Sequence, residues 1–341
     1  MESIVHEGNE HKQLSGYSYR LITIIIPLYN EEENVETIAY AIKKNFVDLI
    51  NIEYRILFVD DGSTDKTLNE IKSMVARDSR ISFLSFSRNF GKDVALLAGF
   101  QQILENVDAV ITIDADLQHP PELIPELIRQ WQLGYDIVYA YREEKNQDAS
   151  LFFHLASSLF YRLISLLTDI KMENGLSDYK IIDKKVIPVI QKIKEDAPFL
   201  RGLLKWVGYK QSGIPYSANS RLKGKSKYPT GTLIKLALHN ITSFSTKPLT
   251  IAIYIGFLTS FIAVMYIPYV LYSLYAGYAI AGWPSTIATI AFFGGIQLII
   301  LGIIGLYLGK IFIQSKERPQ YIINESNLVA VSKYSAYQSA V

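Results

Sequence analysis

Short apolar runs alternate with amphipathic stretches over the first part of the chain. Five runs rich in isoleucine, valine and phenylalanine are predicted strands, at residues 21–27, 54–61, 81–87, 109–116 and 136–141. Four amphipathic segments are predicted helices, at residues 32–48, 65–78, 91–105 and 121–133. Continuous apolar strands are typical of parallel sheets that are covered on both faces. The pattern therefore predicts an α/β domain with a doubly wound, mainly parallel, Rossmann-like sheet.

Polar clusters follow four of these predicted strands. In chain order they read PLYNEEEN, DDGSTD, RNFGK and DADLQHPP. Because ligands of doubly wound sheets bind beyond the carboxyl ends of the strands, we expect a ligand site at this edge. No G-x-G-x-x-G follows the first strand and no P-loop motif occurs, and Pro27 and Tyr29 stand where a dinucleotide fold needs glycines. A dehydrogenase or an ATPase is therefore disfavoured.

A different pattern begins near residue 248. No charged residue occurs from Pro248 to Gly309. A membrane-spanning helix needs about 20 predominantly apolar residues, and the segments 249–272 and 285–309 are both long enough. We predict a two-helix transmembrane hairpin over residues 249–309, since buried core helices of that length would show a polar face. Gly305 and Gly309 have a spacing seen in helix association, which hints at a homo-oligomer.

The flanks of the hairpin predict its topology. Lysines precede the first span and follow the second, so the positive-inside bias puts the large N-terminal domain and both termini in the cytoplasm, at the inner or plasma membrane. We assign residues 1–19 to a mobile tail, 20–230 to the cytoplasmic domain and 310–341 to a cytoplasmic C-terminal tail. Residues 231–248 suit a juxtamembrane amphipathic helix. Residues 150–170 suit either an interfacial helix or an amphipathic core helix.

Charge is distributed unevenly along the chain. The net charge is +1, which gives no general field for nucleic acid, and no nucleic-acid partner is expected. No Asp or Glu occurs from Ala197 to Lys316, whereas nine Lys or Arg residues occur from Arg201 to Lys247. A basic stretch that runs into a membrane segment suits lipid headgroup phosphates. Cysteine is absent, which excludes a disulfide framework and cysteine-based metal or nucleophile sites.

The two aspartates of DADLQ are the strongest chemical signal. Because side chains alternate along a strand, Asp114 and Asp116 are predicted to point the same way. Like charges at that spacing repel, so a cation is expected between them. Hard divalent cations such as Mg²⁺ or Mn²⁺ prefer oxygen ligands and accept phosphate as a co-ligand, and the amide of Gln118 could join them. In DDGSTD, Ser63 or Thr64 can cap the next helix. Capping does not explain the two adjacent acids, and a carboxylate there could accept a hydrogen bond from a base or ribose.

Together these motifs resemble those of family 2 glycosyltransferases with the GT-A fold. The similarity rests on IIIPLYNEEENV, FVDDGSTDKT, SRNFGKDVALLAGF and IDADLQHPPELIPELI, and it continues through RGLLKWVGYKQSGIPY and RLKGKSKYP into the paired spans. The layout is similar to the polyprenyl-phosphate glycosyltransferases: bacterial bactoprenol glucosyltransferases and, more distantly, dolichyl-phosphate mannose synthases. It covers residues 20 to 320. The resemblance implies inverting transfer of a sugar from a nucleotide sugar, UDP-glucose as the best match, to polyprenyl (undecaprenyl) phosphate.

The resemblance also implies roles for particular residues. It implies a nucleotide-sugar pocket of Pro27, Tyr29, Glu31, Asp60, Asp61, Lys92 and Asp114, and a metal site of Asp114, Asp116 and Gln118 for Mg²⁺ or Mn²⁺. Asp178, in GLSDYKIID, matches the catalytic acidic position near the acceptor, although a loop residue that caps the next element would look the same. Candidates for phosphate contacts are Arg142, Arg162, Arg221, Lys225 and Lys227. Lys225 departs from the family, where an acid is more frequent.

Other classes remain for comparison. A processive polysaccharide synthase would carry a Q-x-x-R-W motif and more spans, and RGLLKW lacks that pattern. A transporter is disfavoured because the spans lack ionisable groups. A membrane-tethered module that binds a nucleotide sugar without catalysis is the alternative from a different class. N-acetylglucosamine, an aminoarabinose derivative and mannose remain alternatives to glucose.

Overall fold

The structure is a computed structural model. It describes residues 19–103, 106–142, 176–195, 198–217, 242, 245–277 and 282–328. The chain divides into two units. The first unit draws its residues from Met1–Lys145, Glu173–Gly224 and Gln320–Val341, and the second from Asn146–Met172 and Lys225–Pro319. Each unit is described by itself below.

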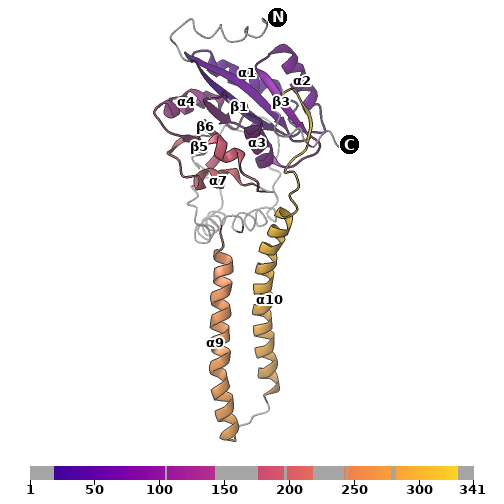
Figure 1. Cartoon of the computed structure of the whole chain (residues 1–341), viewed down its shortest axis with the longest axis vertical. Coiled ribbons are helices and arrows are strands. Elements are labelled where there is room, and N and C mark those ends of the chain that lie inside the picture. Colours follow the sequence, from indigo (N-terminus) through magenta and orange to yellow (C-terminus); the bar gives the residue numbers. More distant parts are fainter. Residues whose placement is uncertain are drawn as a thin grey trace, which may run out of the picture. The chain divides into compact units, whose positions relative to one another are not determined.

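The first unit is built on an eight-stranded sheet (Figure 1). Its strands are β1 (Arg20–Leu28), β2 (Ile52–Asp60), β3 (Ile81–Phe86), β4 (Ala109–Thr112), β5 (Ile137–Arg142), β6 (Leu176–Asp183), β7 (Gln211–Tyr216) and β8 (Ile323–Ser326). The spatial order is β7-β5-β6-β4-β1-β2-β3-β8. Its helices are α1 (Val35–Phe46), α2 (Thr67–Arg77), α3 (Lys92–Gln101), η1 (Pro121–Leu123), α4 (Ile124–Gln132), α6 (Ile187–Gln191) and α7 (Leu200–Trp206). The predicted doubly wound, mainly parallel α/β class is confirmed.

Helices cover both faces of the sheet because the central strand is apolar on both sides. Ile24 and Ile26 of β1 belong to the core that also contains Val35 and Ile38 of α1 and Leu127 of α4. Ile25 points the other way, toward α3, where an added Cβ at Gly99 would lie 2.6 Å from its Cγ2 atom. The continuous apolar run of β1 is thus explained by two cores, one on each face.

Two strands of the sheet, β6 and β8, run antiparallel to their neighbours and depart from the repeated βαβ pattern. β6 lies between β4 and β5 and pairs antiparallel with both, with Thr112 opposite Lys180 and Tyr141 opposite Leu176. The beginning of β6 therefore lies at the same edge of the sheet as the ends of β4 and β5. β8 pairs antiparallel with β3 at the outer side of the sheet. Neither strand was among those that the apolar pattern predicted.

β8 comes from the C-terminal segment, which we had assigned to a tail. The Phe83 amide donates to Asn327 Oδ1 at 2.7 Å, and the Ser87 amide donates to the Ile322 carbonyl at 3.0 Å. The ring of Tyr321 stacks on Phe86, with 5.1 Å between centroids. These contacts make the segment after the last helix part of the sheet.

The second unit contains two long apolar helices, α9 (Lys247–Tyr275) and α10 (Trp283–Gln314) (Figure 1). By length and composition, Lys247–Ser273 and Phe292–Gln314 could each cross a membrane, and their apolar side chains are almost entirely exposed. Within this unit the Tyr307 hydroxyl donates to the Ser245 carbonyl at 2.6 Å. This exposure is unlike that of the core helix of a soluble protein.

The close approach of α3 to β1 gives a test of the fold. Replacing Gly99 with valine puts a branched side chain against Ile25, so we expect a loss of about 1–3 kcal/mol in the free energy of unfolding. Thermal unfolding of the purified protein in detergent measures the change. Lys43→Val, at an exposed position of α1, controls for the lower helix propensity of valine. Equal effects of the two substitutions would contradict the packing described here.

Candidate functional site

The two aspartates of DADLQ lie in a turn beyond the end of β4. We predicted a strand that continues to Asp116, and this was wrong, because β4 ends at Thr112. Strand alternation therefore does not explain how Asp114 and Asp116 are directed. Leu117 has a φ of +58°, which is unusual for a residue with a side chain. The backbone amide of Gln118 donates to Asp116 Oδ1 at 3.1 Å and closes this turn.

Lys92, the first residue of α3, links the turn to β6. Its Nζ atom lies 2.6 Å from Asp114 Oδ1 and 2.8 Å from Asp178 Oδ2. Burial lowers the pKa of Lys92, but the two carboxylates outweigh burial and raise it above its ordinary value. The ammonium group of Lys92 thus pairs with the carboxylates of Asp114 and Asp178 at the same time.

Arg201 of α7 forms the second cationic contact of Asp178. Its Nε atom donates to Oδ1 at 2.7 Å and its Nη2 atom to Oδ2 at 2.6 Å, a two-pronged pair. The Asp178 side chain is only 6% exposed. Burial alone would raise the pKa of this carboxyl, but Lys92 and Arg201 hold it well below its usual range. Asp178 is therefore a permanent anion between two cations.

Two further titratable groups complete this charged cluster. Asp93 follows Lys92 on α3, and burial, assisted by the negative charge of Asp178, raises its pKa to about 6. Lys180 lies two residues beyond Asp178 on β6, and burial lowers its pKa to about 8. Lys92, Lys180 and Arg201 balance Asp93, Asp114 and Asp178, so the charges of the cluster cancel in number when all six are ionised.

His119 supports the turn through a hydrogen bond and a ring contact. Its Nδ1 atom accepts a hydrogen bond from the Asp114 amide at 3.2 Å, and its ring stacks on Tyr179 with 5.3 Å between centroids. Burial lowers the pKa of His119. A neutral imidazole with an accepting Nδ1 fits this contact, so His119 fixes the backbone of the turn.

The loops after β1 and β2 are fastened to each other. The backbone amide of Asn30 donates to Ser63 Oγ at 2.9 Å, and the backbone amide of Thr64 donates to Asn30 Oδ1 at 2.8 Å. Asn30 has a φ of +56°, a conformation that asparagine tolerates better than most residues. Gly62 is required because a Cβ there would lie 2.4 Å from the carbonyl carbon of Arg88.

Asp60 and Asp61 are both buried and engaged within the protein. Asp60 accepts from the Ser63 amide at 3.0 Å and from Ser85 Oγ at 2.7 Å. Asp61 accepts from the amides of Phe90 and Gly91 at 2.7 and 2.9 Å. These contacts tie the loop after β2 to the loop that leads into α3. They give both acids a scaffolding task beside the predicted nucleotide pocket.

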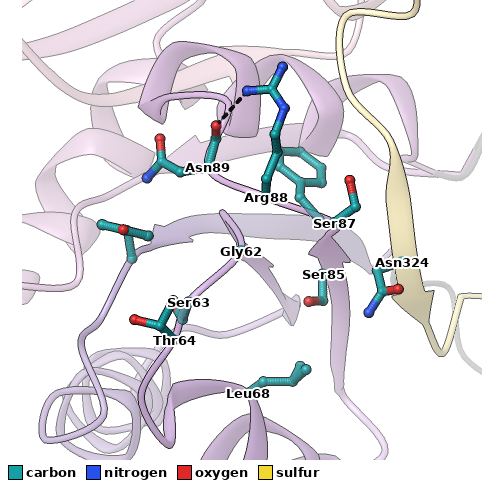
Figure 2. A pocket seen from close by; sticks show the side chains of 11 residues that line it. Gly62, Ser63, Thr64, Leu68, Ser85, Ser87, Arg88, Asn89 and Asn324 are labelled. Atoms are coloured by element: carbon teal, nitrogen blue, oxygen red, sulfur yellow. Dashed lines mark hydrogen bonds between the residues drawn. The ribbon is translucent and has the colours of Figure 1, made fainter.

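A cavity of about 400 Å³ opens beside these loops (Figure 2). Its wall carries the hydroxyls of Ser63, Thr64, Ser85 and Ser87, the amides of Asn89 and Asn324, and the ring of Tyr29. Gly62 lies in the middle of the view, and Asn324 comes from β8. The cavity is thus formed by the loops after β1 and β2, by Leu68 of α2, by β3 with the loop after it, and by the C-terminal strand. Its lining is suited to a small polar ligand with a planar part.

The remaining predicted residues lie in different places. Pro27 is buried in β1, beyond the last residue that pairs with β4, so its missing N–H costs no bond to that strand. Glu31 accepts from Asn34 Nδ2 at 2.5 Å. Arg142 is exposed at the end of β5, opposite Tyr216 of β7, whose ring meets His119. Arg162, Arg221, Lys225 and Lys227 lie outside the described residues, as do most of the predicted helices at 150–170 and 231–248.

The donor set of the turn fits a divalent cation that also binds phosphate. Among the described residues, no three His, Asp or Glu side chains gather into a metal cluster. Asp114 and Asp116 offer two carboxylates, and the Asp114 side chain is 24% exposed. Mg²⁺ is commonly held by one or two carboxylates, with substrate phosphates and water as the other ligands. Two aspartates at an open turn match that arrangement.

Sequence reasoning missed four members of the site: Asp93, His119, Lys180 and Arg201. Arg201 was counted in the basic stretch but not assigned to the site. The motif RNFGKD places Asp93 directly after Lys92, a residue predicted to bind the ligand, and this position was a signal that Asp93 lies near the site. His119 stands in the motif DADLQHPP and bonds within that turn, whereas its stacking on Tyr179 and the place of Lys180 depend on the antiparallel insertion of β6.

Comparison with known proteins identifies the family of the chain. The glycosyl transferase family 2 model matches residues 23–190. The uncharacterized glycosyltransferase YkcC of Bacillus subtilis is 41% identical over 307 residues, 89% of this chain and 93% of that protein. The prophage bactoprenol glucosyl transferase homolog of Escherichia coli is 39% identical over 303 residues, 89% of this chain and 98% of that protein. The chain belongs to glycosyl transferase family 2.

A solved structure is also similar. It is glucosyl-3-phosphoglycerate synthase from Mycobacterium tuberculosis in complex with Mn²⁺, UDP-glucose and phosphoglyceric acid, at 19% identity and a TM-score of 0.43. The match covers 65% of this chain and 78% of that chain. The family assignment rests on the sequence relatives.

The raised pKa of Asp93 predicts a pH dependence of stability. A carboxyl whose pKa is raised on folding favours the folded state at low pH, and this contribution is lost as the pH rises through about 6. An asparagine side chain cannot titrate, so we expect Asp93→Asn to gain melting temperature relative to the wild type between pH 5 and pH 7.5. Thermal unfolding at both pH values measures the difference. Asp48→Asn, at an exposed position, controls for the chemical change. A difference that is constant with pH would contradict the burial of Asp93.

Proposed function

We propose that this protein transfers glucose, with inversion, from UDP-glucose to a polyprenyl phosphate of the undecaprenyl type. Membership of glycosyl transferase family 2 supports the reaction class, and the relatives named bactoprenol glucosyl transferases support the donor sugar and the lipid acceptor. The product would be a lipid-linked glucose for glycosylation of the cell envelope. The observation that carries the proposal is the convergence of Asp114, Lys92 and Asp178 at the ligand-binding edge of the sheet.

In this proposal, Asp178 positions other groups and does not act as a strong base. The acceptor is a phosphate monoester with a second pKa near ~6, so it is largely dianionic at neutral pH and is already a nucleophile. The depressed pKa of Asp178 makes it a poor proton acceptor. Its two cation contacts instead orient Lys92 and Arg201. Catalysis then depends on holding the acceptor phosphate in line with the anomeric carbon.

Lys92 is proposed to bind the donor diphosphate. Its ammonium group is fixed by Asp114 and Asp178, and its side chain is 39% exposed, so it can meet a ligand that enters the site. A positive group fixed before the reaction stabilises negative charge that develops on the leaving nucleoside diphosphate. Asp114 and Asp116, with Gln118 beside them, would hold Mg²⁺ or Mn²⁺, which supplies further stabilisation of that charge when bound.

The acceptor side of the proposal concerns the membrane. Helices α9 and α10 would cross it, with the sheet domain and both termini in the cytoplasm, because Lys247 lies at the start of α9 and Lys310 and Lys316 lie near the end of α10. Arg142, together with Arg162, Arg221, Lys225 and Lys227, would contact the lipid phosphate. Assembly into a homo-oligomer through glycines of α10 is part of the same proposal.

A transfer assay tests the function. Membranes that contain the protein are supplied with undecaprenyl phosphate and, separately, with radiolabelled UDP-glucose, UDP-N-acetylglucosamine or GDP-mannose. We expect label in the lipid fraction from UDP-glucose at least tenfold above the other donors. Membranes without the protein are the control. Transfer of a different sugar would overturn the donor, and nucleotide binding without any lipid product would favour a non-catalytic binding module.

Metal removal tests the site of Asp114 and Asp116. We expect EDTA to lower transfer by at least 100-fold, and Mn²⁺ or Mg²⁺ to restore it, because the metal neutralises the leaving diphosphate. Asp116→Asn should raise the metal concentration needed for half-maximal activity. Asp48→Asn, at an exposed position after α1, is the control. Full transfer in EDTA would contradict the metal assignment.

A further inference from the structure

The C-terminal strand β8 supplies a side chain to the cavity described above, which ties it to the donor site. Asn324 is exposed and lines the cavity with Ser85 and Ser87 of the neighbouring strand and loop (Figure 2). Ile323 pairs with Phe86 and Glu325 with Ser85, and the register shifts between them, so Asn324 is an extra residue held between two paired ones. The amide of Asn324 is therefore presented on a strand that is held firmly in place.

The position of the cavity along the sheet determines which part of a nucleotide sugar it can receive. The strand order is β4-β1-β2-β3-β8. Asp114 follows β4, and the cavity extends from Tyr29 after β1, along the loop after β2, to β3 and β8. From β4 to β3 there are three strand spacings of about 4.8 Å each, about 14 Å in total. An extended nucleoside diphosphate has a length of this order. With its diphosphate at Asp114 and Lys92, its other end reaches the cavity.

The sugar cannot be that other end. It must lie near Asp178 and the acceptor phosphate, because the bond to its anomeric carbon is broken there. The cavity that Tyr29 helps to line is therefore the place that remains for the base. Tyr29 is 40% exposed and lines the cavity with an aromatic ring, on which a planar base can stack.

We propose that Asn324 of β8 hydrogen-bonds the nucleobase of the donor and helps to select it. A uracil ring presents an N–H group next to a carbonyl group, and the amide of asparagine offers an acceptor and two donors that match this edge. A side chain at the C-terminal end of the chain thereby becomes part of the donor site. The inference rests on the proposed function, since it takes a uridine nucleotide as the donor.

Anchoring contacts explain how a C-terminal segment can act as a binding element. The Tyr321 hydroxyl donates to Gln101 Oε1 of α3 at 2.9 Å. Gln320 donates to the carbonyl of Glu195, and Lys72 of α2 forms an ion pair with Glu325. The anchored residues Gln320, Tyr321 and Glu325 lie on both sides of Asn324 in sequence. The side chain is therefore positioned before a ligand arrives, which lowers the entropy cost of binding.

Equilibrium binding of nucleotides to the full-length protein in detergent tests the inference, with Mn²⁺ and without acceptor. The probes are UDP, UDP methylated at N3 of the base, 2′-deoxy-UDP and pyrophosphate. For Asn324→Ala we expect UDP affinity to fall about 2- to 10-fold, the equivalent of one hydrogen bond. Methylation at N3 should weaken binding to the wild type more than to the variant, whereas pyrophosphate should bind both equally.

The control is Ile322→Ala, at an exposed position two residues before Asn324 that does not line the cavity. It should bind UDP as the wild type does. Equal UDP affinity of Asn324→Ala and the wild type overturns the inference. The inference is also overturned if loss of the 2′-hydroxyl weakens binding to the wild type more than to the variant, because Asn324 would then contact the ribose. A loss of pyrophosphate binding in the variant would show a structural role and would overturn the inference as well. A wild-type protein that binds no UDP contradicts the proposed donor as well.

Discussion

The pairing of Asp178 with Lys92 and Arg201 is the interaction on which the site depends. A carboxylate that is 6% exposed would be costly to leave ionised without partners, and two cations supply the compensation. The same contacts fix the starting turn of α3 and the position of α7 against β6. Through Lys92 they also reach Asp114 and the turn after β4. One buried anion thus organises four segments of the chain.

Topology explains why that anion is available at the ligand-binding edge. In a purely parallel sheet, only strand ends and the loops after them reach this edge. β6 runs in the opposite direction, so residues near its beginning lie there as well. The antiparallel β8 has the same effect on the other side of β3, where it brings Asn324 to the cavity. The two reversed strands therefore carry the side chains that extend the site beyond the four polar clusters.

The sequence was sufficient for the parts of the fold with a strong local pattern. Uninterrupted runs such as the one in β1, and the uncharged segments of α9 and α10, predict their structure because burial or lipid demands apolar residues throughout. The polar clusters likewise predicted the edge of the sheet at which the charged cluster around Asp178 lies. β8 was not predicted because INES has no apolar run, and its place depends on pairing with β3, more than two hundred residues earlier. Arg201 was missed for the same reason, because only the folded chain brings it to Asp178.

The central claim is that Asp178 acts through its cation partners and not as a base. A double-mutant cycle on the rate of glucosyl transfer tests it most directly, with Asp178→Asn, Arg201→Gln and the combined variant at saturating substrates. If the two residues act as one ion pair, removing the second partner costs little once the first is gone, because no uncompensated charge remains. We predict that the combined variant is no more than about threefold slower than the slower single variant. Losses that multiply, or an Asp178→Asn variant that is inactive while Arg201→Gln keeps wild-type activity, would contradict the account.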